Sequence, residues 1–88
     1  MSIVEKLRQR LQALEPSHID IHDDSARHAG HAGARDGGHF NILIVSPKFA
    51  GLGTLQRHRL VYDAAADLMQ NGIHALSISA KTPQEIQL

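Results

Sequence analysis

Histidine is the residue of this chain that could do chemistry most readily, because seven of the 88 residues are histidine and none is cysteine. His28, His31 and His39 lie close together in the stretch RHAGHAGARDGGHF, among glycines and alanines. Imidazole nitrogens bind transition metals, and a His-x-x-His spacing occurs in metal sites, although it is weakly specific in such surroundings. The stretch is therefore either a metal-binding loop or a solvated linker whose histidines are incidental.

His74 lies in an apolar context, near the start of the segment IHALSISAKT. Alternation in that segment predicts a strand whose two faces carry His74, Leu76 and Ile78, and Ile73, Ala75 and Ser77. The residues alone favour a histidine at the edge of the core that bonds a backbone carbonyl. The alternative is a metal ligand that the strand anchors and that still reaches solvent. His39, at the start of an earlier strand, looks more structural.

A third group is basic: Arg57, His58 and Arg59 fall on the first turns of a predicted helix, and Lys48 precedes it. Cations near a helix start oppose the helix dipole, so they are either simply solvated or available to an anionic partner. Nine basic and nine acidic side chains balance, so no global positive field favours nucleic acid. Gly51-Leu52-Gly53 is not a GXXG loop for gripping a nucleic-acid backbone, and aromatic residues are too few to stack bases.

Catalysis has little support in the sequence. His22-Asp23-Asp24 could suggest an acid–base or metal pair, but aspartates at a strand end and the following turn explain it more simply. The lack of cysteine excludes disulfides, cysteine-ligated zinc and a cysteine nucleophile. We therefore predict that the chain is not an enzyme.

These candidate residues need a scaffold, and the sequence predicts one α+β domain over residues 1–88 with a flexible loop at about 25–38. Capping boxes begin the first and last helices, at Ser2 with Glu5 and at Thr82 with Glu85. The predicted order is α-β-β-α-α-β-α. Its segments are a helix ending before 16, strands at 17–24 and 39–46, a turn or single helical turn at 48–53, a helix at 54–71, a strand at 73–81 and a helix from 82.

Apolar patterning predicts how these elements pack. The strand at 39–46 is apolar on both faces, with Phe40, Ile42 and Ile44 on one side, which suits a central strand. The helix at 54–71, with Thr54 as its N-cap, carries a stripe that includes Leu60, Ala64 and Leu68. We expect a three-stranded sheet with helices on one face.

The opening segment MSIVEKLRQRLQALEP contains no long apolar run. We therefore expect neither a signal peptide nor a membrane span, and we predict a cytoplasmic location. We also expect the chain to fold without metal, because the capped helices and the strand pattern need none to be complete.

Several motifs, taken together and in order, resemble the BolA family closely. The resemblance runs from about Ile3 to Glu85, nearly the whole chain. The motifs that carry it are Gly38-His39-Phe40…Val45-Ser46, Phe49-Ala50-Gly51, RHRLVY at 57–62, Ile73-His74-Ala75-Leu76-Ser77 and Thr82-Pro83-Gln84-Glu85. The resemblance implies a fold akin to the type II KH domain.

The resemblance also implies a partner and a cofactor. The partner is a monothiol glutaredoxin of the CGFS type with glutathione, and the cofactor is a shared [2Fe–2S] cluster. The implied role is iron–sulfur cluster assembly or trafficking, or iron regulation. His74 matches the family's cluster ligand, and His28, with His31 as its substitute, matches an accessory ligand in the loop. The partner's cysteine and glutathione would supply the thiolates, which makes a mixed centre broadly like Rieske ligation.

The family also includes proteins described as DNA-binding regulators, and this is the alternative function. It would use the helix-turn-helix-like region around RHRLVY, with Arg57, His58, Arg59 and Lys48 as contacts. Because the charge is balanced and few cations cluster, we expect DNA binding by this chain to be weak and non-specific.

Overall fold

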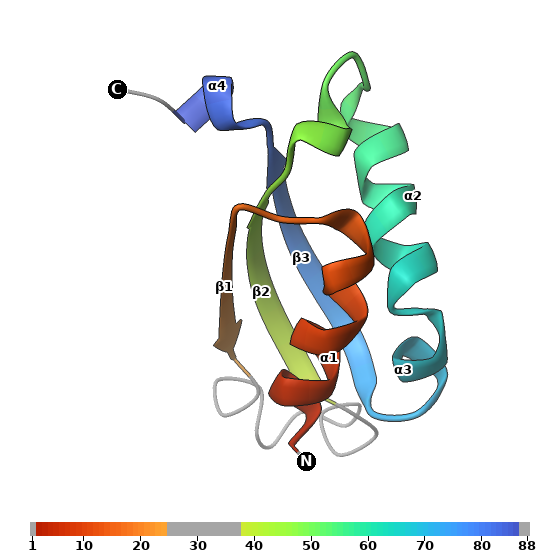
Figure 1. The fold of residues 1–88 in the computed structure, drawn as a ribbon. Helices are drawn as coiled ribbons and strands as arrows, with labels where there is room; N and C mark the ends of the chain where they lie inside the picture. Colours follow the sequence, from red (N-terminus) through yellow and green to blue (C-terminus); the bar gives the residue numbers. More distant parts are fainter. Residues whose placement is uncertain (1, 25–37, 87–88) are drawn as a thin grey trace.

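The computed structural model describes residues 2–24 and 38–86, so most of the predicted loop, including His28 and His31, lies outside the described residues. The helices and single helical turns are α1 (Ile3–Leu11), η1 (Gln12–Leu14), η4 (Pro47–Phe49), α2 (Thr54–Ala64), α3 (Ala66–Gln70) and α4 (Pro83–Ile86). The strands are β1 (His18–Asp23), β2 (Gly38–Val45) and β3 (Ile73–Lys81). This is the predicted element order (Figure 1).

The strands form one mixed sheet in the order β1-β2-β3. β1 runs antiparallel to β2, and β3 runs parallel to β2. The prediction that β2 is central is therefore confirmed. Because β2 and β3 are parallel, their first residues lie at the same end of the sheet, where the positions of His39 and His74 meet.

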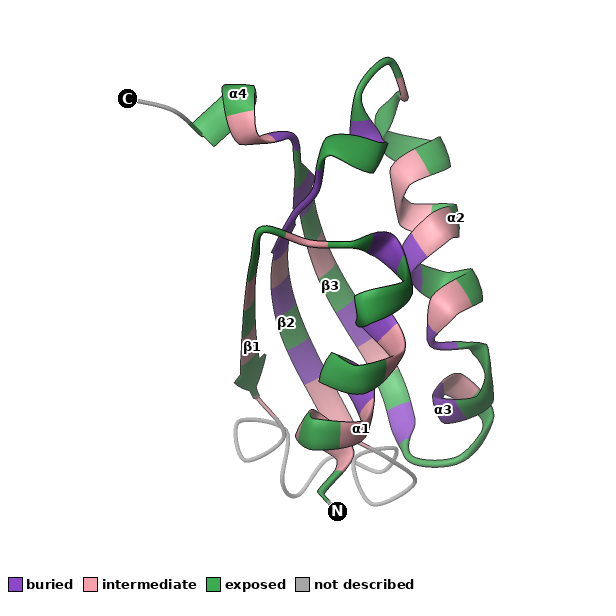
Figure 2. Ribbon diagram, in the orientation of Figure 1, coloured by how far each residue is buried: buried purple, intermediate pink, exposed green. Residues whose placement is uncertain are grey.

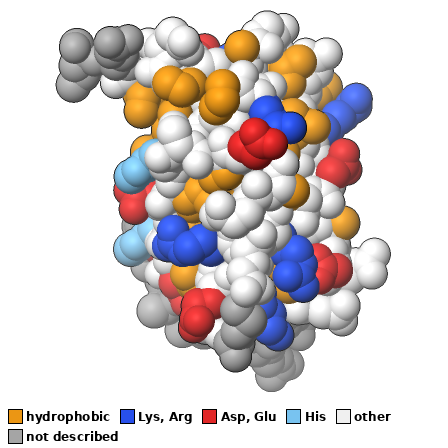
Figure 3. Space-filling view, viewed as in Figure 1, with side chains coloured by type: hydrophobic (Ala, Val, Ile, Leu, Met, Phe, Trp, Pro, Cys, Tyr) orange, Lys and Arg blue, Asp and Glu red, His pale blue; other side chains and the backbone are white. Residues whose placement is uncertain are grey.

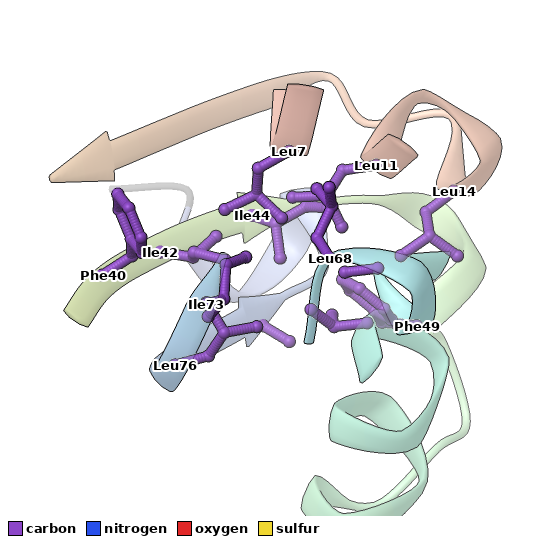
Figure 4. Packing of buried hydrophobic residues seen from close by; sticks show 13 residues of the cluster. Leu7, Leu11, Leu14, Phe40, Ile42, Ile44, Phe49, Leu68, Ile73 and Leu76 are labelled. Carbon is purple, nitrogen blue, oxygen red and sulfur yellow. The ribbon is translucent and has the colours of Figure 1, made fainter. Parts of the chain in front are cut away.

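The core lies between the sheet and helices α1, α2 and α3, which pack on one face as predicted, whereas α4 lies beyond the end of β3 and has no buried residue (Figure 2). Leu7 and Leu11 of α1 meet Ile44 of β2 and Leu68 of α3 in one buried cluster (Figure 4). In β2 the alternation places Phe40, Ile42 and Ile44 inside, in agreement with the sequence. Burial of such aliphatic and aromatic side chains is the main stabilising contribution in a domain of this size.

Both predicted capping boxes are present. The Glu5 amide donates to the Ser2 hydroxyl at 3.1 Å, and the Glu5 carboxylate accepts from the Ser2 amide at 3.4 Å. In α4 the corresponding distances are 3.3 Å to the Thr82 hydroxyl and 2.7 Å from the Thr82 amide. Each box satisfies backbone donors that the first turn of a helix otherwise leaves unpaired.

The predicted long helix is wrong in two details. Gly53, not Thr54, is the N-cap, and its amide donates to the Gln56 side chain at 3.0 Å. The helix is also divided at Ala65, whose φ and ψ of −103° and 15° separate α2 from α3. There the Ala65 carbonyl accepts from the amides of both Leu68 and Met69. The apolar stripe continues across this tightened turn, so its period does not reveal the break.

In the part of the chain that the structure describes, no helix is long and apolar enough to cross a membrane.

Candidate functional site

His74 is exposed at the start of β3, and a β-bulge accounts for its position. Gly38 pairs with Ile73 and His39 pairs with Ala75, so His74 is the extra residue between them. A bulge interrupts the two-residue alternation of a strand and re-aims a side chain. The predicted face is therefore right for Leu76 and Ile78 but wrong for His74 and Ile73, because Ile73 is buried and His74 is exposed.

The bulge brings His74 against His39. The centroids of the two imidazole rings are 5.0 Å apart, and the ring planes are tilted by 45°. His39 is half-buried and follows Gly38 at the start of β2. The sequence predicts no contact between these two histidines and favours a structural role for His39. The one available signal was that both stand at the start of a strand, but the parallel pairing and its register were not visible in the sequence.

The backbone around the two histidines is held on both sides. The Gly38 amide donates to the Gly72 carbonyl at 3.0 Å, and the Asp24 amide donates to the His39 carbonyl at 2.8 Å. Gly72 has a φ of +132°, and a Cβ there would lie 2.5 Å from Cδ1 of Ile3. The turn into β3 therefore favours glycine for its backbone conformation, whereas the close approach involves only the end of the Ile3 side chain, which can shift.

The chemistry of the donors suits a metal that is bound jointly with another molecule. His74 offers an exposed imidazole on a strand, which is a ligand that suits iron, zinc or copper. Among residues 2–24 and 38–86, no three His, Cys, Asp or Glu side chains are grouped so as to hold a metal ion. A complete set of ligands for a metal would therefore need donors from outside residues 2–24 and 38–86. The predicted loop ligands His28 and His31 lie outside the described residues.

Arg57, predicted as a contact for a partner or DNA, makes a network within the chain. Its guanidinium donates to both carboxylate oxygens of Glu85 at 2.6 and 3.1 Å, and to the carbonyls of Leu52 and Ala80 at 2.9 and 3.0 Å. The side chain is 12 % exposed. The Arg57 contact, with the Thr82 amide, lowers the pKa of Glu85 to about 2, and it raises the pKa of Arg57. Arg57 thus connects α2 to the end of β3 and to α4.

The other predicted basic residues do not all lie beside Arg57. His58 lines the same hollow as Arg57, beside the end of β3, but Arg59 does not and is exposed. Lys48 lies in η4, with its Nζ 3.9 Å from a Glu15 carboxylate oxygen. On the face viewed from α1, basic and acidic side chains are interspersed (Figure 3). Binding of DNA or a partner by these residues remains a prediction.

The chain folds as a small α+β domain, and a comparison with protein families shows to which family it belongs. Residues 11–85 match the family described as "BolA-like protein", and the chain belongs to that family. The comparison with type II KH domains remains a prediction.

Two relatives from Arabidopsis thaliana show how far the similarity extends. "SufE-like protein 1, chloroplastic/mitochondrial" is 47% identical over 88 residues, which cover 92% of this chain and 24% of that protein. "Protein BOLA1, chloroplastic" is 47% identical over 85 residues, which cover 91% of this chain and 53% of that protein. The chain thus spans about a quarter and about half of their lengths.

One solved structure matches this chain over nearly the whole length of both chains. The solved structure "BolA1 from Arabidopsis thaliana" has a TM-score of 0.86 and 42% sequence identity, and the match covers 99% of this chain and 98% of that one. The predicted α+β fold with a three-stranded sheet is therefore confirmed.

Proposed function

We propose that this domain binds a [2Fe–2S] cluster together with a monothiol glutaredoxin and glutathione, in iron–sulfur cluster assembly, trafficking or iron regulation. The observation that carries the proposal is His74, an exposed imidazole that a bulge turns away from the core at the end of the sheet. Membership of the BolA-like family supports it.

In this proposal the chain supplies imidazoles and the partner supplies thiolates. The chain has no cysteine, so the two sulfur ligands would come from the glutaredoxin and from glutathione. When bound, such a centre has a higher reduction potential than an all-thiolate one. His74 is the first ligand of this chain. For the second, the sequence predicts His28, with His31 as its substitute.

The alternative, a DNA-binding regulator, has less support. Arg57 already makes four hydrogen bonds to Glu85, Leu52 and Ala80, so its positive charge is offset within the chain. Arg59 and Lys48, the exposed cations of the predicted group, are left to contact phosphate, and Lys48 already lies 3.9 Å from a Glu15 carboxylate oxygen. With so few phosphate contacts, binding would be weak and would depend little on salt concentration.

Co-expression with a monothiol glutaredoxin tests the proposal. We expect a stable coloured complex whose visible absorption and circular dichroism differ from those of the glutaredoxin homodimer. A complex without a cluster, or no complex, would contradict the proposal. Tight, sequence-selective DNA binding at physiological salt, without a glutaredoxin complex, would favour the regulator instead.

A further inference from the structure

β1 is an edge strand, and one side of its backbone faces away from the rest of the sheet. It lies at one end of the strand order and pairs with β2 (Figure 1). At the end of this pairing the Asp24 amide donates to the His39 carbonyl. In an antiparallel pair, alternate residues hydrogen-bond to the neighbouring strand and the residues between them face away. The amides and carbonyls of Ile19 and Ile21 therefore face outward.

Arg8 covers part of this edge, but only weakly. Its guanidinium donates to the Ile19 carbonyl at 3.5 Å, which is long for a hydrogen bond. Arg8 is itself exposed, so its side chain can move aside. Outward-facing amides and carbonyls at a sheet edge are a template on which another strand can pair.

The side chains of β1 differ between its two faces. Ile19 and Ile21 are half-buried and pack against the core on the side of the helices. His18, Asp20 and His22 are exposed on the opposite face. Figure 3 shows histidine and acidic side chains along this edge of the molecule. A row of lysines would repel a second copy of the strand, whereas histidine alternating with aspartate offers both donors and acceptors.

This pattern is complementary to itself when two copies of β1 pair about a two-fold axis at Ile21. Asp20 of each copy then lies opposite His22 of the other, in the kind of pair whose facing side chains are closest. An imidazole N–H can donate to a carboxylate in either protonation state. The Asp20 side chain is 77 % exposed, and its Oδ2 lies 3.5 Å from Nε2 of His18, so the carboxylate can accept from a further donor.

Other registers fit less well. A shift of two residues in one direction places Asp20 opposite Asp20 of the other copy, and in the other direction opposite Asp24, so that carboxylates face each other. A shift of four pairs Asp20 with His18 but leaves only a short overlap of the two strands. The register centred on Ile21 also brings the two Ile21 side chains together, which covers apolar surface that is half-exposed in the single chain.

We propose that two copies of this chain pair edge to edge through β1, antiparallel and centred on Ile21, so that two three-stranded sheets become one. A second copy fits better than an unrelated peptide, because one two-fold axis matches the backbone groups, the Asp20–His22 pairs and the apolar Ile21 pair together. The inference does not rest on the proposed function, since β2 separates β1 from His74 and β3. The paired segment is short, so we expect a reversible dimer with a Kd on the order of 0.1–1 mM.

The first test is sedimentation equilibrium of the free full-length chain, up to a concentration of about 1 mM. We expect the dimer fraction to rise with concentration. His22→Asp places two carboxylates opposite each other and should weaken the dimer about tenfold or more. The double variant Asp20→His with His22→Asp restores the pairs in reverse and should restore the dimer. The matched control Ser79→Asp adds an acid at an exposed position of β3 and should leave the dimer unchanged.

Two outcomes of this experiment would overturn the proposal. A wild type that stays monomeric throughout the range would leave the edge of β1 to an extended segment of another protein. A dimer that is equally stable in His22→Asp would place the contact elsewhere on the molecule. Circular dichroism of each variant checks that it is folded.

The second test is cross-linking, which the lack of native cysteine makes specific. Ile21→Cys would place two thiols on residues whose Cα atoms are about 5.5 Å apart, which suits a disulfide. Ile19→Cys is the matched control, a half-buried isoleucine of the same strand. In this register the two copies of residue 19 are offset by four residues, about 13 Å along the strand.

In a buffer of reduced and oxidised glutathione, two thiols become a disulfide as oxidised glutathione is reduced. We expect a covalent dimer of Ile21→Cys on non-reducing electrophoresis, and much less of Ile19→Cys. Equal cross-linking of the two variants, or none in either, would overturn the proposal. Cross-linking of Ile19→Cys alone would also overturn it, because it would show the register shifted by four residues. Neither test contains glutaredoxin or a cluster, so failure here leaves the proposed function standing.

Discussion

Each end of β3 lies beside candidate residues that the sequence indicates, and the two ends differ in how those residues are used. At the Ile73 end, His74 is exposed beside His39, and its imidazole faces away from the core. At the Lys81 end, Arg57 is 12 % exposed and bonds to a carboxylate and two carbonyls of the same chain. The first end is thus suited to binding, and the second to holding elements together.

This difference separates two kinds of polar residue that look alike in a sequence. A buried or half-buried charge whose donors are all used stabilises the fold, and its removal leaves other groups unpaired. An exposed ligand on a strand contributes little to stability and is available to another molecule. Substitutions at the Ile73 end should therefore affect the cluster and not the free energy of unfolding. Substitutions at the Lys81 end should lower the free energy of unfolding and leave the cluster in place.

The largest expected effect is on the cluster, at the Ile73 end. His74→Ala should abolish the cluster in the glutaredoxin complex, because the bulge places no other side chain in its position. The free energy of unfolding should change by less than about 0.5 kcal/mol, since the residue is exposed. Visible absorption of the co-purified complex and urea unfolding of the free chain check the two halves. Retention of the wild-type spectrum would show that the ligand assignment is wrong.

The next effect concerns the glycine that supports the same end. Gly72→Ala should destabilise the fold by about 1–3 kcal/mol, because alanine is strained at positive φ. The added Cβ would also lie 2.5 Å from Cδ1 of Ile3. Gly51→Ala is the matched control, with a φ of +79° and no atom within 4 Å of the added Cβ. Urea unfolding should show a smaller loss for Gly51→Ala. Equal losses would show that neither the backbone conformation at Gly72 nor the contact with Ile3 adds to the cost.

A smaller effect is expected from the arginine at the other end. Arg57→Ala should lower the urea midpoint and leave the cluster spectrum unchanged, because it unpairs Glu85 and the carbonyls of Leu52 and Ala80. Arg57→Lys should recover only part of the loss, since lysine lacks the planar fork. The control Arg59→Ala, at an exposed position of the same helix, should have little effect on unfolding. Loss of the cluster in Arg57→Ala without a change in the urea midpoint would show that Arg57 acts in binding and not in stabilising the fold.

The smallest expected effect is in acid. The pKa of Glu85 is lowered to about 2, below its ordinary value of 4.5. A carboxylate with a depressed pKa in the folded state contributes stability above its ordinary pKa, and that contribution is lost as the pH falls toward the folded value. The urea midpoint of the wild type should therefore fall between about pH 4.5 and 2 more steeply than that of Glu85→Gln. Equal slopes in the two proteins would show that the ion pair does not contribute to acid stability.

Much of the fold could be predicted because it depends on neighbours in sequence. The capping boxes at Ser2 and Thr82 involve residues three positions apart, and both were recognised. The inward face of β2 follows from its two-residue period. The break at Ala65 and the bulge at His74 could not be predicted. Each is a change in backbone hydrogen bonding that leaves no mark in the pattern of apolar and polar residues.

The sequence by itself determined the element order, the α+β class and the position of β2 in the sheet. Local hydrogen bonds and the periodic placement of apolar residues are sufficient for these. His74 is a candidate ligand through the resemblance to the BolA family, since the residues alone favour a histidine at the edge of the core. Only the tertiary structure decided that His39 lies against His74 and that Arg57 binds Glu85. The physical reason is that both contacts join segments far apart in the chain. Their register depends on how the sheet and helices pack into one core, which no local pattern specifies.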